Sequence, residues 1–139
     1  MVVLAFGTFD VFHIGHLNYL KQAKKIADGD ELVVVVALDE NALKHSHKKL
    51  IHSEDERFEI IKNLKIVDRA LLGEKNPFDI LKKLKPKTIV LGYDQLNDIK
   101  LLELEIKKLN LDIKIIRAKP YHHEEKKSSI IKRKLLGLN

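Results

Sequence analysis

The chain has 139 residues, 45% of them hydrophobic and 33% charged, and it contains no cysteine. A chain of this length and composition is most simply one soluble domain with its own core, so we predict a single domain over residues 1–139. The absence of cysteine excludes a disulfide framework and a thiolate nucleophile or metal site. The longest wholly apolar run, residues 32–38, is far too short to cross a bilayer, and nothing at the N-terminus resembles a signal peptide. We therefore expect a cytoplasmic location and no membrane partner.

Charge and composition also narrow the range of partners. The formal net charge of +6 favours anions such as nucleotides and phosphorylated metabolites, although a thermophile-like surface rich in lysine and glutamate would explain the charge equally well. We do not expect a nucleic-acid partner, because the lysines are dispersed and only 6% of residues are aromatic. No metal site is expected among His45, His47 and His52, because no carboxylate or cysteine is fixed among them.

The first predicted strand and helix meet at a turn that carries glycines and histidines. Residues 2–6 form an apolar run that predicts a buried strand, and the helical spacing of apolar residues begins just after His16. Ligands bind at this end of a strand in α/β sheets, and the unpaired N–H groups of a helix N-terminus suit phosphate. Gly7 and Gly15 would let backbone approach a ligand, while His13 and His16 add donors that can carry charge near neutral pH. The alternative is that the histidines merely cap the helix.

Strands and helices alternate along the rest of the chain. The run at 31–38 is apolar throughout its middle, which is typical of a strand covered on both faces in a parallel sheet. Ser53 and Glu56 have the spacing of a capping box at the start of a helix. The predicted strands are 2–6, 31–38, 70–72, 88–91 and 113–117, and the predicted helices are 16–27, 39–44, 53–63, 77–84, 97–109 and one that starts at 128. This alternation predicts an α/β fold in which a parallel five-stranded sheet has helices on both faces.

Two later stretches place further polar residues at the ends of predicted elements. Gly92-Tyr93-Asp94 follows the strand at 88–91, so it should lie on the same sheet edge as the first turn. Ser128 and Ser129 open the last predicted helix, where hydroxyl groups can cap the helix and also meet a phosphate. Together with the first turn, these stretches suggest a nucleotide site.

A family resemblance sharpens this interpretation. Gly7-Thr8-Phe9-Asp10, followed by His13-Ile14-Gly15-His16, resembles the signature of the HIGH-motif nucleotidylyltransferase superfamily, in the form typical of its cytidylyltransferase-like branch. The resemblance implies a Rossmann-like sheet with strand order 3-2-1-4-5. It also implies nucleotidyl transfer, in which a phosphate oxygen of an acceptor attacks the α-phosphorus of a nucleoside triphosphate and pyrophosphate leaves.

The resemblance implies a role for each residue that matches the superfamily. The catalytic group, which would donate to the phosphates and balance their charge, comprises His13, His16 and Lys44. The nucleotide would be bound by Gly7, Thr8, Phe9, His13, Gly15, His16, Gly92, Asp94, Ser128 and Ser129. The acceptor would be bound by Asp10, Arg57 and Tyr93. A divalent ion, most simply Mg²⁺, would bridge phosphate oxygens with few protein ligands.

Three stretches are most similar to the archaeal FAD synthase group, which joins FMN and ATP to give FAD and pyrophosphate. They are residues 37–41, the Glu56-Arg57 pair and residues 91–95. Glycerol-3-phosphate cytidylyltransferase, which would use CTP, is the alternative enzyme, and a nucleotide-binding sensor is the non-enzymatic alternative. The expected partners are therefore small molecules, with a homodimer as a further possibility.

Overall fold

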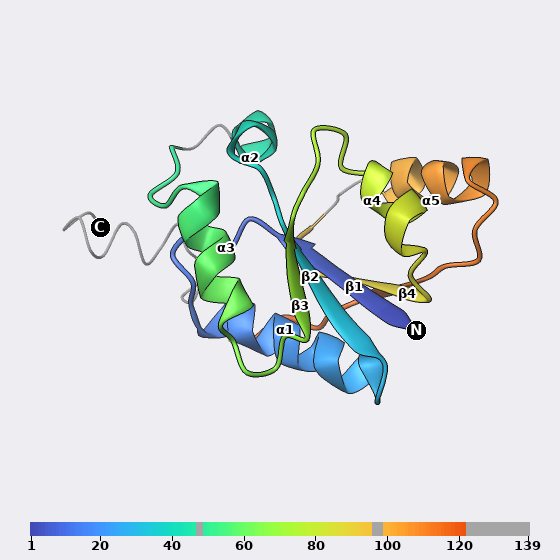
Figure 1. The fold of residues 1–139 in the computed structure, drawn as a ribbon, viewed down its shortest axis with the longest axis horizontal. Helices are drawn as coiled ribbons and strands as arrows, with labels where there is room; N and C mark the ends of the chain where they lie inside the picture. The colour runs from blue at the N-terminus through green and yellow to red at the C-terminus, as the bar shows by residue number, and fades with distance from the viewer. Residues whose placement is uncertain (47–48, 96–98, 122–139) are drawn as a thin grey trace.

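The computed structural model describes residues 1–46, 49–95 and 99–121, in which helices alternate with the strands of one sheet (Figure 1). The strands are β1 (Val2–Gly7), β2 (Glu31–Val36), β3 (Arg69–Leu72), β4 (Thr88–Leu91) and β5 (Lys114–Arg117). The helices are α1 (Ile14–Ala27), α2 (Asp39–Ser46), α3 (Glu54–Lys62), α4 (Asp79–Leu84) and α5 (Ile99–Lys108). All neighbouring strands are parallel, in the order β3-β2-β1-β4-β5, which confirms the predicted Rossmann-like sheet.

Alternate side chains of the central strands pack into two cores, one on each face of the sheet. Val3 and Ala5 of β1 join the core formed with α1 and α3, while Leu4 joins the core formed with α4 and α5. Figure 1 shows these two pairs of helices on opposite sides of the strands, as the sequence predicts. The register pairs Gly7 with Val36, so β1 and β2 end together, and α2 lies beyond this carboxyl edge of the sheet.

Several element boundaries differ from the predicted ones, and three of the differences, each of two residues, lie at the end of β2 and at the starts of α1 and α4. β2 ends at Val36, two residues early, because the Ala37 carbonyl accepts from an arginine side chain instead of a neighbouring strand. α1 begins at Ile14, two residues early, since His13 serves as its N-cap. α4 begins at Asp79, two residues later than predicted, after a turn. The first two differences arise at the functional edge of the sheet, where side chains and backbone compete for the same carbonyl and N–H groups.

Two of the helices, α1 and α3, begin at a capping box. The predicted capping box is confirmed: Ser53 Oγ accepts from the Glu56 N–H, and the Glu56 carboxylate accepts from the Ser53 N–H. None of the helices in the described ranges is both long and apolar enough to span a membrane. The last predicted helix, from residue 128, lies outside the described residues.

Candidate active site

The turn between β1 and α1 lies at the carboxyl edge of the sheet, as predicted. Two of its residues take left-handed backbone conformations, Phe9 with φ 57° and Val11 with φ 52°. This conformation is uncommon outside glycine, costs about 1–3 kcal/mol for each residue, and is least tolerated by β-branched side chains. It persists only where surrounding contacts fix it, so this turn is held in one shape by its neighbours.

The Phe9 side chain supports the turn from inside. Its ring is 3% exposed and lies edge-on to the His16 ring, with 5.6 Å between centroids, and 6.4 Å from the Tyr19 ring. A Cβ atom at Gly7 would come within 2.7 Å of the Phe9 ring, so glycine is required there to admit the ring. The Phe9 side chain therefore packs beneath the turn, and the nucleotide-binding role of Phe9 stays a prediction.

His13 and His16 both cap the start of α1 and still offer a donor. The Nδ1 atom of His13 accepts from the Gly15 N–H at 3.0 Å, and the Nδ1 atom of His16 accepts from the His13 N–H at 3.2 Å. A ring nitrogen that accepts a hydrogen bond carries no proton, so these bonds assign the proton of each ring to Nε2. The two rings stack with 3.8 Å between centroids. The turn thus holds two parallel imidazoles, each with an Nε2–H that the caps leave unused.

The surroundings of these rings favour their neutral forms. Burial, followed by the proximity of His13, lowers the pKa of His16 from 6.5 to about 3, against an opposing attraction from Asp10. Burial also lowers the pKa of His13, opposed by the Asp94 carboxylate. The lowered pKa values favour the neutral imidazoles at neutral pH, whereas the sequence suggested that these residues can carry charge there. Protonating Nδ1 would in addition break the caps, which opposes charging.

The depressed pKa of His16 predicts that stability falls as the pH falls. The unfolded chain binds a proton at this residue below about pH 6.5, whereas the folded chain does not until about pH 3, so the free energy of unfolding decreases through that window. The expected loss is about 1–2 kcal/mol between about pH 7.5 and pH 5. Urea unfolding at the two pH values measures this loss. The His16→Asn variant, which cannot titrate, should lose less, and an equal loss in both proteins would contradict the assignment.

The turn after β4 is tied to the end of β1 by a glutamine. Gln95 Oε1 accepts from the Gly92 N–H at 2.9 Å, and Gln95 Nε2 donates to the Phe6 carbonyl at 2.8 Å. Arg117 Nη1 donates to the Gly92 carbonyl at 3.0 Å and to further carbonyls of the same turn. Asp94 is exposed, and its charge acts on the His13 imidazole. The first and second predicted turns therefore lie side by side at one edge of the sheet.

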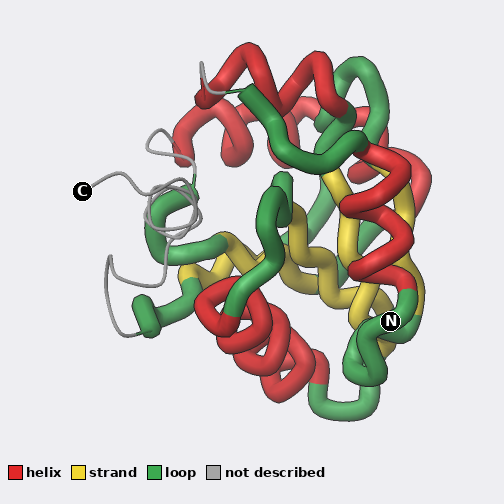
Figure 2. Tube along the Cα trace, turned by 90° about the vertical axis from the view of Figure 1, so that its left-hand side faces the viewer, coloured by secondary structure: helices red, strands yellow, loops and turns green. Residues whose placement is uncertain are grey.

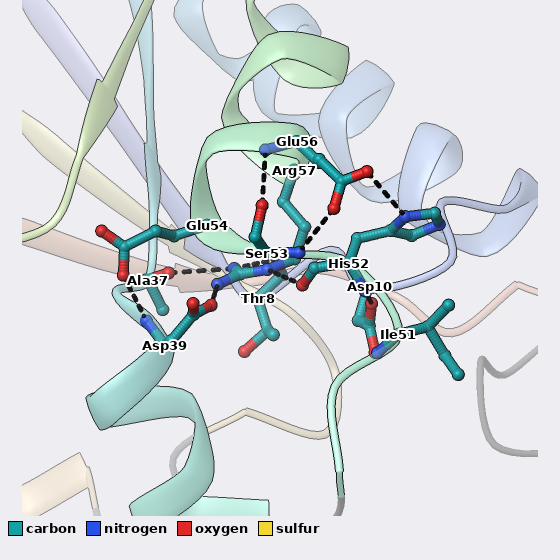
Figure 3. A network of polar contacts seen from close by, with 10 residues as sticks. All are labelled: Thr8, Asp10, Ala37, Asp39, Ile51, His52, Ser53, Glu54, Glu56 and Arg57. Atoms are coloured by element: carbon teal, nitrogen blue, oxygen red, sulfur yellow. Dashed lines mark hydrogen bonds and ion pairs between the residues drawn. The ribbon is translucent and has the colours of Figure 1, made fainter.

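Asp10 is committed to the backbone of a distant segment. It is 5% exposed, and its two carboxylate oxygens accept from the Ile51 and His52 N–H groups, each at 3.0 Å (Figure 3). Asp10 as an acceptor-binding residue stays a prediction, because each carboxylate oxygen can accept a second hydrogen bond besides the one from the 51–52 segment. Asp10 fixes the position of that segment beside the first turn.

Arg57 is also buried, although the sequence suggested an active-site role for it. Its side chain is 0% exposed. Nη1 donates to the Thr8 and Ala37 carbonyls at 2.8 and 2.9 Å, Nε donates to the His52 carbonyl at 3.2 Å, and Nη2 pairs with Asp39 at 2.6 Å (Figure 3). The structure therefore corrects the prediction of direct acceptor contact: Arg57 lies beneath the site and joins the segments around it.

The other predicted residues that the structure describes lie at or near the same edge. Thr8 is half-buried in the first turn, and Lys44 is exposed on α2 beyond the sheet edge. The Gly15 N–H is already bonded to His13, so it is not free for phosphate. Tyr93 is half-buried in the second turn. Two predicted residues lie outside the described ones, Ser128 and Ser129.

Sequence reasoning missed several residues that shape the site. Tyr19 donates its hydroxyl to the Val90 carbonyl at 2.5 Å and accepts from the Phe6 N–H at 3.2 Å, where β1 and β4 diverge. A tyrosine on an otherwise apolar helix face could have signalled this, because a buried hydroxyl needs a partner. The bonds from Gln95 to the Phe6 carbonyl and from Arg117 to the Gly92 carbonyl span 89 and 25 residues, so no local pattern predicts them.

Comparisons with known proteins identify the family of the chain. The family model described as cytidylyltransferase-like matches residues 4–134. The chain belongs to the cytidylyltransferase-like family. Among its relatives, a FAD synthase from Thermoplasma volcanium is 43% identical over 98% of this chain and 94% of its own length. A FAD synthase from Korarchaeum cryptofilum is 46% identical over 94% of this chain and 89% of its own length.

Two solved structures have folds similar to that of this chain. A crystal structure described as the lipopolysaccharide core biosynthesis protein from Thermoplasma volcanium matches with a TM-score of 0.79 and 44% identity, over 87% of this chain and 98% of that one. A protein of unknown function from Archaeoglobus fulgidus matches with a TM-score of 0.69 and 19% identity, over 86% and 90% of the two chains, which supports the fold alone. The family membership confirms the resemblance read from the first turn.

Proposed function

We propose that the chain is a FAD synthase, which transfers the AMP unit of ATP to FMN and releases pyrophosphate. The observation that carries this proposal is the pair of FAD synthase relatives, 43% and 46% identical across nearly the whole of both chains. The match covers 94% and 89% of those relatives, so it extends over nearly their whole length.

The proposed reaction is a displacement at phosphorus. A phosphate oxygen of FMN forms a bond to the α-phosphorus of ATP, the bond from that phosphorus to the bridging oxygen of the β-phosphate breaks, and pyrophosphate leaves with the electron pair. Negative charge builds on the α-phosphoryl oxygens and on the leaving group, so the protein must supply position and hydrogen-bond donors. In this proposal the Nε2–H groups of His13 and His16 donate to these oxygens; the occupation of both Nδ1 atoms by the caps supports this assignment.

Other residues take supporting roles in this proposal. Thr8, beside α1, holds the reacting phosphoryl group, and Lys44 of α2 balances its charge. Gly92 and Asp94 lie along the nucleoside, and Tyr93 contacts the acceptor. The hydroxyl groups that would anchor the pyrophosphate end are those of Ser128 and Ser129. A homodimer and a cytoplasmic location stay predictions.

A divalent ion would neutralise phosphate charge when it binds. Among the residues that the structure describes, no three histidine, aspartate or glutamate side chains gather closely enough to hold a metal ion. We therefore propose that Mg²⁺ arrives with ATP and is held mainly by phosphate oxygens, as is usual for this ion.

A matrix of substrates tests the proposed function. The purified protein is incubated with Mg²⁺ and either ATP or CTP, together with FMN, glycerol 3-phosphate or phosphocholine, and pyrophosphate release and the coupled product are measured. We expect FAD from ATP and FMN, and little product from the other pairs. CDP-glycerol formation from CTP would replace FAD synthase with the cytidylyltransferase alternative. Tight nucleotide binding without pyrophosphate from any pair would indicate a sensor.

A further inference from the structure

Arg57 and its four partners form a buried polar network, called here the Arg57 hub: Arg57 with Thr8, Ala37, Asp39 and His52. We propose that the Arg57 hub positions Lys44, by fixing the start of α2 relative to the first turn. The inference rests on the proposed function, because it takes Lys44 to be a phosphate-binding residue. Arg57 and Asp39 act through other groups and are therefore positioning residues.

The hub joins three segments that are distant in sequence. The Thr8 carbonyl belongs to the first turn, the Ala37 carbonyl to the end of β2, and the His52 carbonyl to the segment before α3. Figure 3 shows the guanidinium group lying between these carbonyls. A planar guanidinium can hold several acceptors in fixed directions at once, which a lysine ammonium on a flexible stem cannot do. The hub therefore fixes the relative positions of these segments.

Asp39 connects the hub to α2. It is the first residue of that helix, and its carboxylate pairs with Arg57 Nη2 at 2.6 Å. Its N–H donates to Glu54 Oε1 at 2.8 Å, at the start of α3. Two residues further on, buried Asn41 donates to the Glu74 carbonyl at 3.0 Å. The first turn of α2 is thus anchored at three points.

Lys44 depends on this anchoring. It lies on the exposed side of α2, five residues after Asp39, which corresponds to about 7.5 Å along a helix. The chain between them is one continuous helix, so a shift or tilt at Asp39 moves the Lys44 ammonium with it. A flexible lysine can compensate only for small displacements, and phosphate contacts weaken steeply with distance.

Asp39 is the residue to vary. Truncating Arg57 would leave a cavity at a fully buried position and several half-buried acceptors without their donor, which would destabilise the whole chain. The Asp39 side chain is 40% exposed, so water can replace it when it is removed. Glu40 provides a matched control, since Glu40→Ala removes the same charge from the same helical turn at an exposed position. A stabilising role of Asp39 alone would change the melting temperature without linking Asp39 to Lys44.

The test is a double-mutant cycle of Asp39→Ala and Lys44→Ala, with ATP affinity measured by calorimetry and FAD formation measured alongside. We expect each single variant to bind ATP about tenfold more weakly, Glu40→Ala to remain within about twofold of wild type, and the double variant to be within about twofold of the weaker single variant. Effects that multiply to about a hundredfold would overturn the inference, as would an equal loss in Glu40→Ala.

The two readouts separate this inference from the proposed function. ATP affinity reports on the positioning of Lys44 whether or not FMN is the acceptor. If the wild type bound ATP but formed no FAD, the proposed function would fail, while the coupling in ATP affinity would still decide the inference. If every protein formed FAD, but the losses of the two single variants multiplied in the double variant, the proposed function would stand and the inference would fail.

Discussion

The His16→Ala variant should form FAD more than about tenfold more slowly than the wild type, and on the order of 10²-fold more slowly if its Nε2–H meets the transition state directly. The substitution removes that donor. It also removes the acceptor for the His13 N–H and the ring that stacks on His13 at 3.8 Å. Steady-state rates at saturating ATP and FMN measure the effect.

Two conservative variants separate the donor from the cap. An asparagine at position 16 can accept from the His13 N–H as Nδ1 does, but its amide does not reach the Nε2 position. We expect His16→Asn to melt close to the wild type and to be about as slow as His16→Ala. A glutamine reaches further, so His16→Gln should recover part of the rate. An unchanged rate in His16→Ala, or a full rate in His16→Asn, would remove the role given to this donor.

The Phe9→Ala variant should lose about 3 kcal/mol of stability, which corresponds to a drop of about 10 °C in the melting temperature for a chain of this size. The Phe9 ring is 3% exposed and fills the space between Gly7, His16 and Tyr19, so its removal leaves a cavity beneath the turn. Thermal unfolding followed by circular dichroism measures the loss.

Leucine is the matched control at this position. Phe9→Leu keeps the left-handed backbone at φ 57° and most of the buried apolar volume, so it should cost only about 1 kcal/mol. Alanine and leucine have the same strained backbone at this position, so the difference in stability between Phe9→Ala and Phe9→Leu measures the packing of the side chain alone. A melting temperature for Phe9→Ala equal to that of the wild type would show that the ring does not support the turn.

The sheet was predictable because its signals are local. The apolar run at 31–38 indicates a strand buried on both faces, and the helical spacing after His16 indicates an amphipathic helix, so an α/β alternation follows from neighbouring residues. The strand order came from the resemblance of the first turn. The position of the two turns at one edge of the sheet then follows from the topology, because parallel strands end on the same side.

The roles of Asp10 and Arg57 were not predictable, because their partners are distant in sequence. Asp10 bonds to backbone 41 and 42 residues away, and Arg57 bonds to Thr8 across 49 residues. A charged residue beside a motif suggests contact with a ligand. Whether that residue is buried instead depends on distant segments, and no local sequence pattern predicts that they pack around it. The neutral state of the histidines was partly accessible, since His13 and His16 have the three-residue spacing of a capping box.

The most direct test of the account follows the phosphorus atoms of ATP. The protein is incubated with Mg²⁺, FMN and ATP that carries radioactive phosphorus in either the α or the γ position. The account predicts that the α label appears in FAD and the γ label appears in pyrophosphate, in equal amounts. A γ label on the flavin product, or no labelled flavin product at all, would contradict adenylyl transfer at this site.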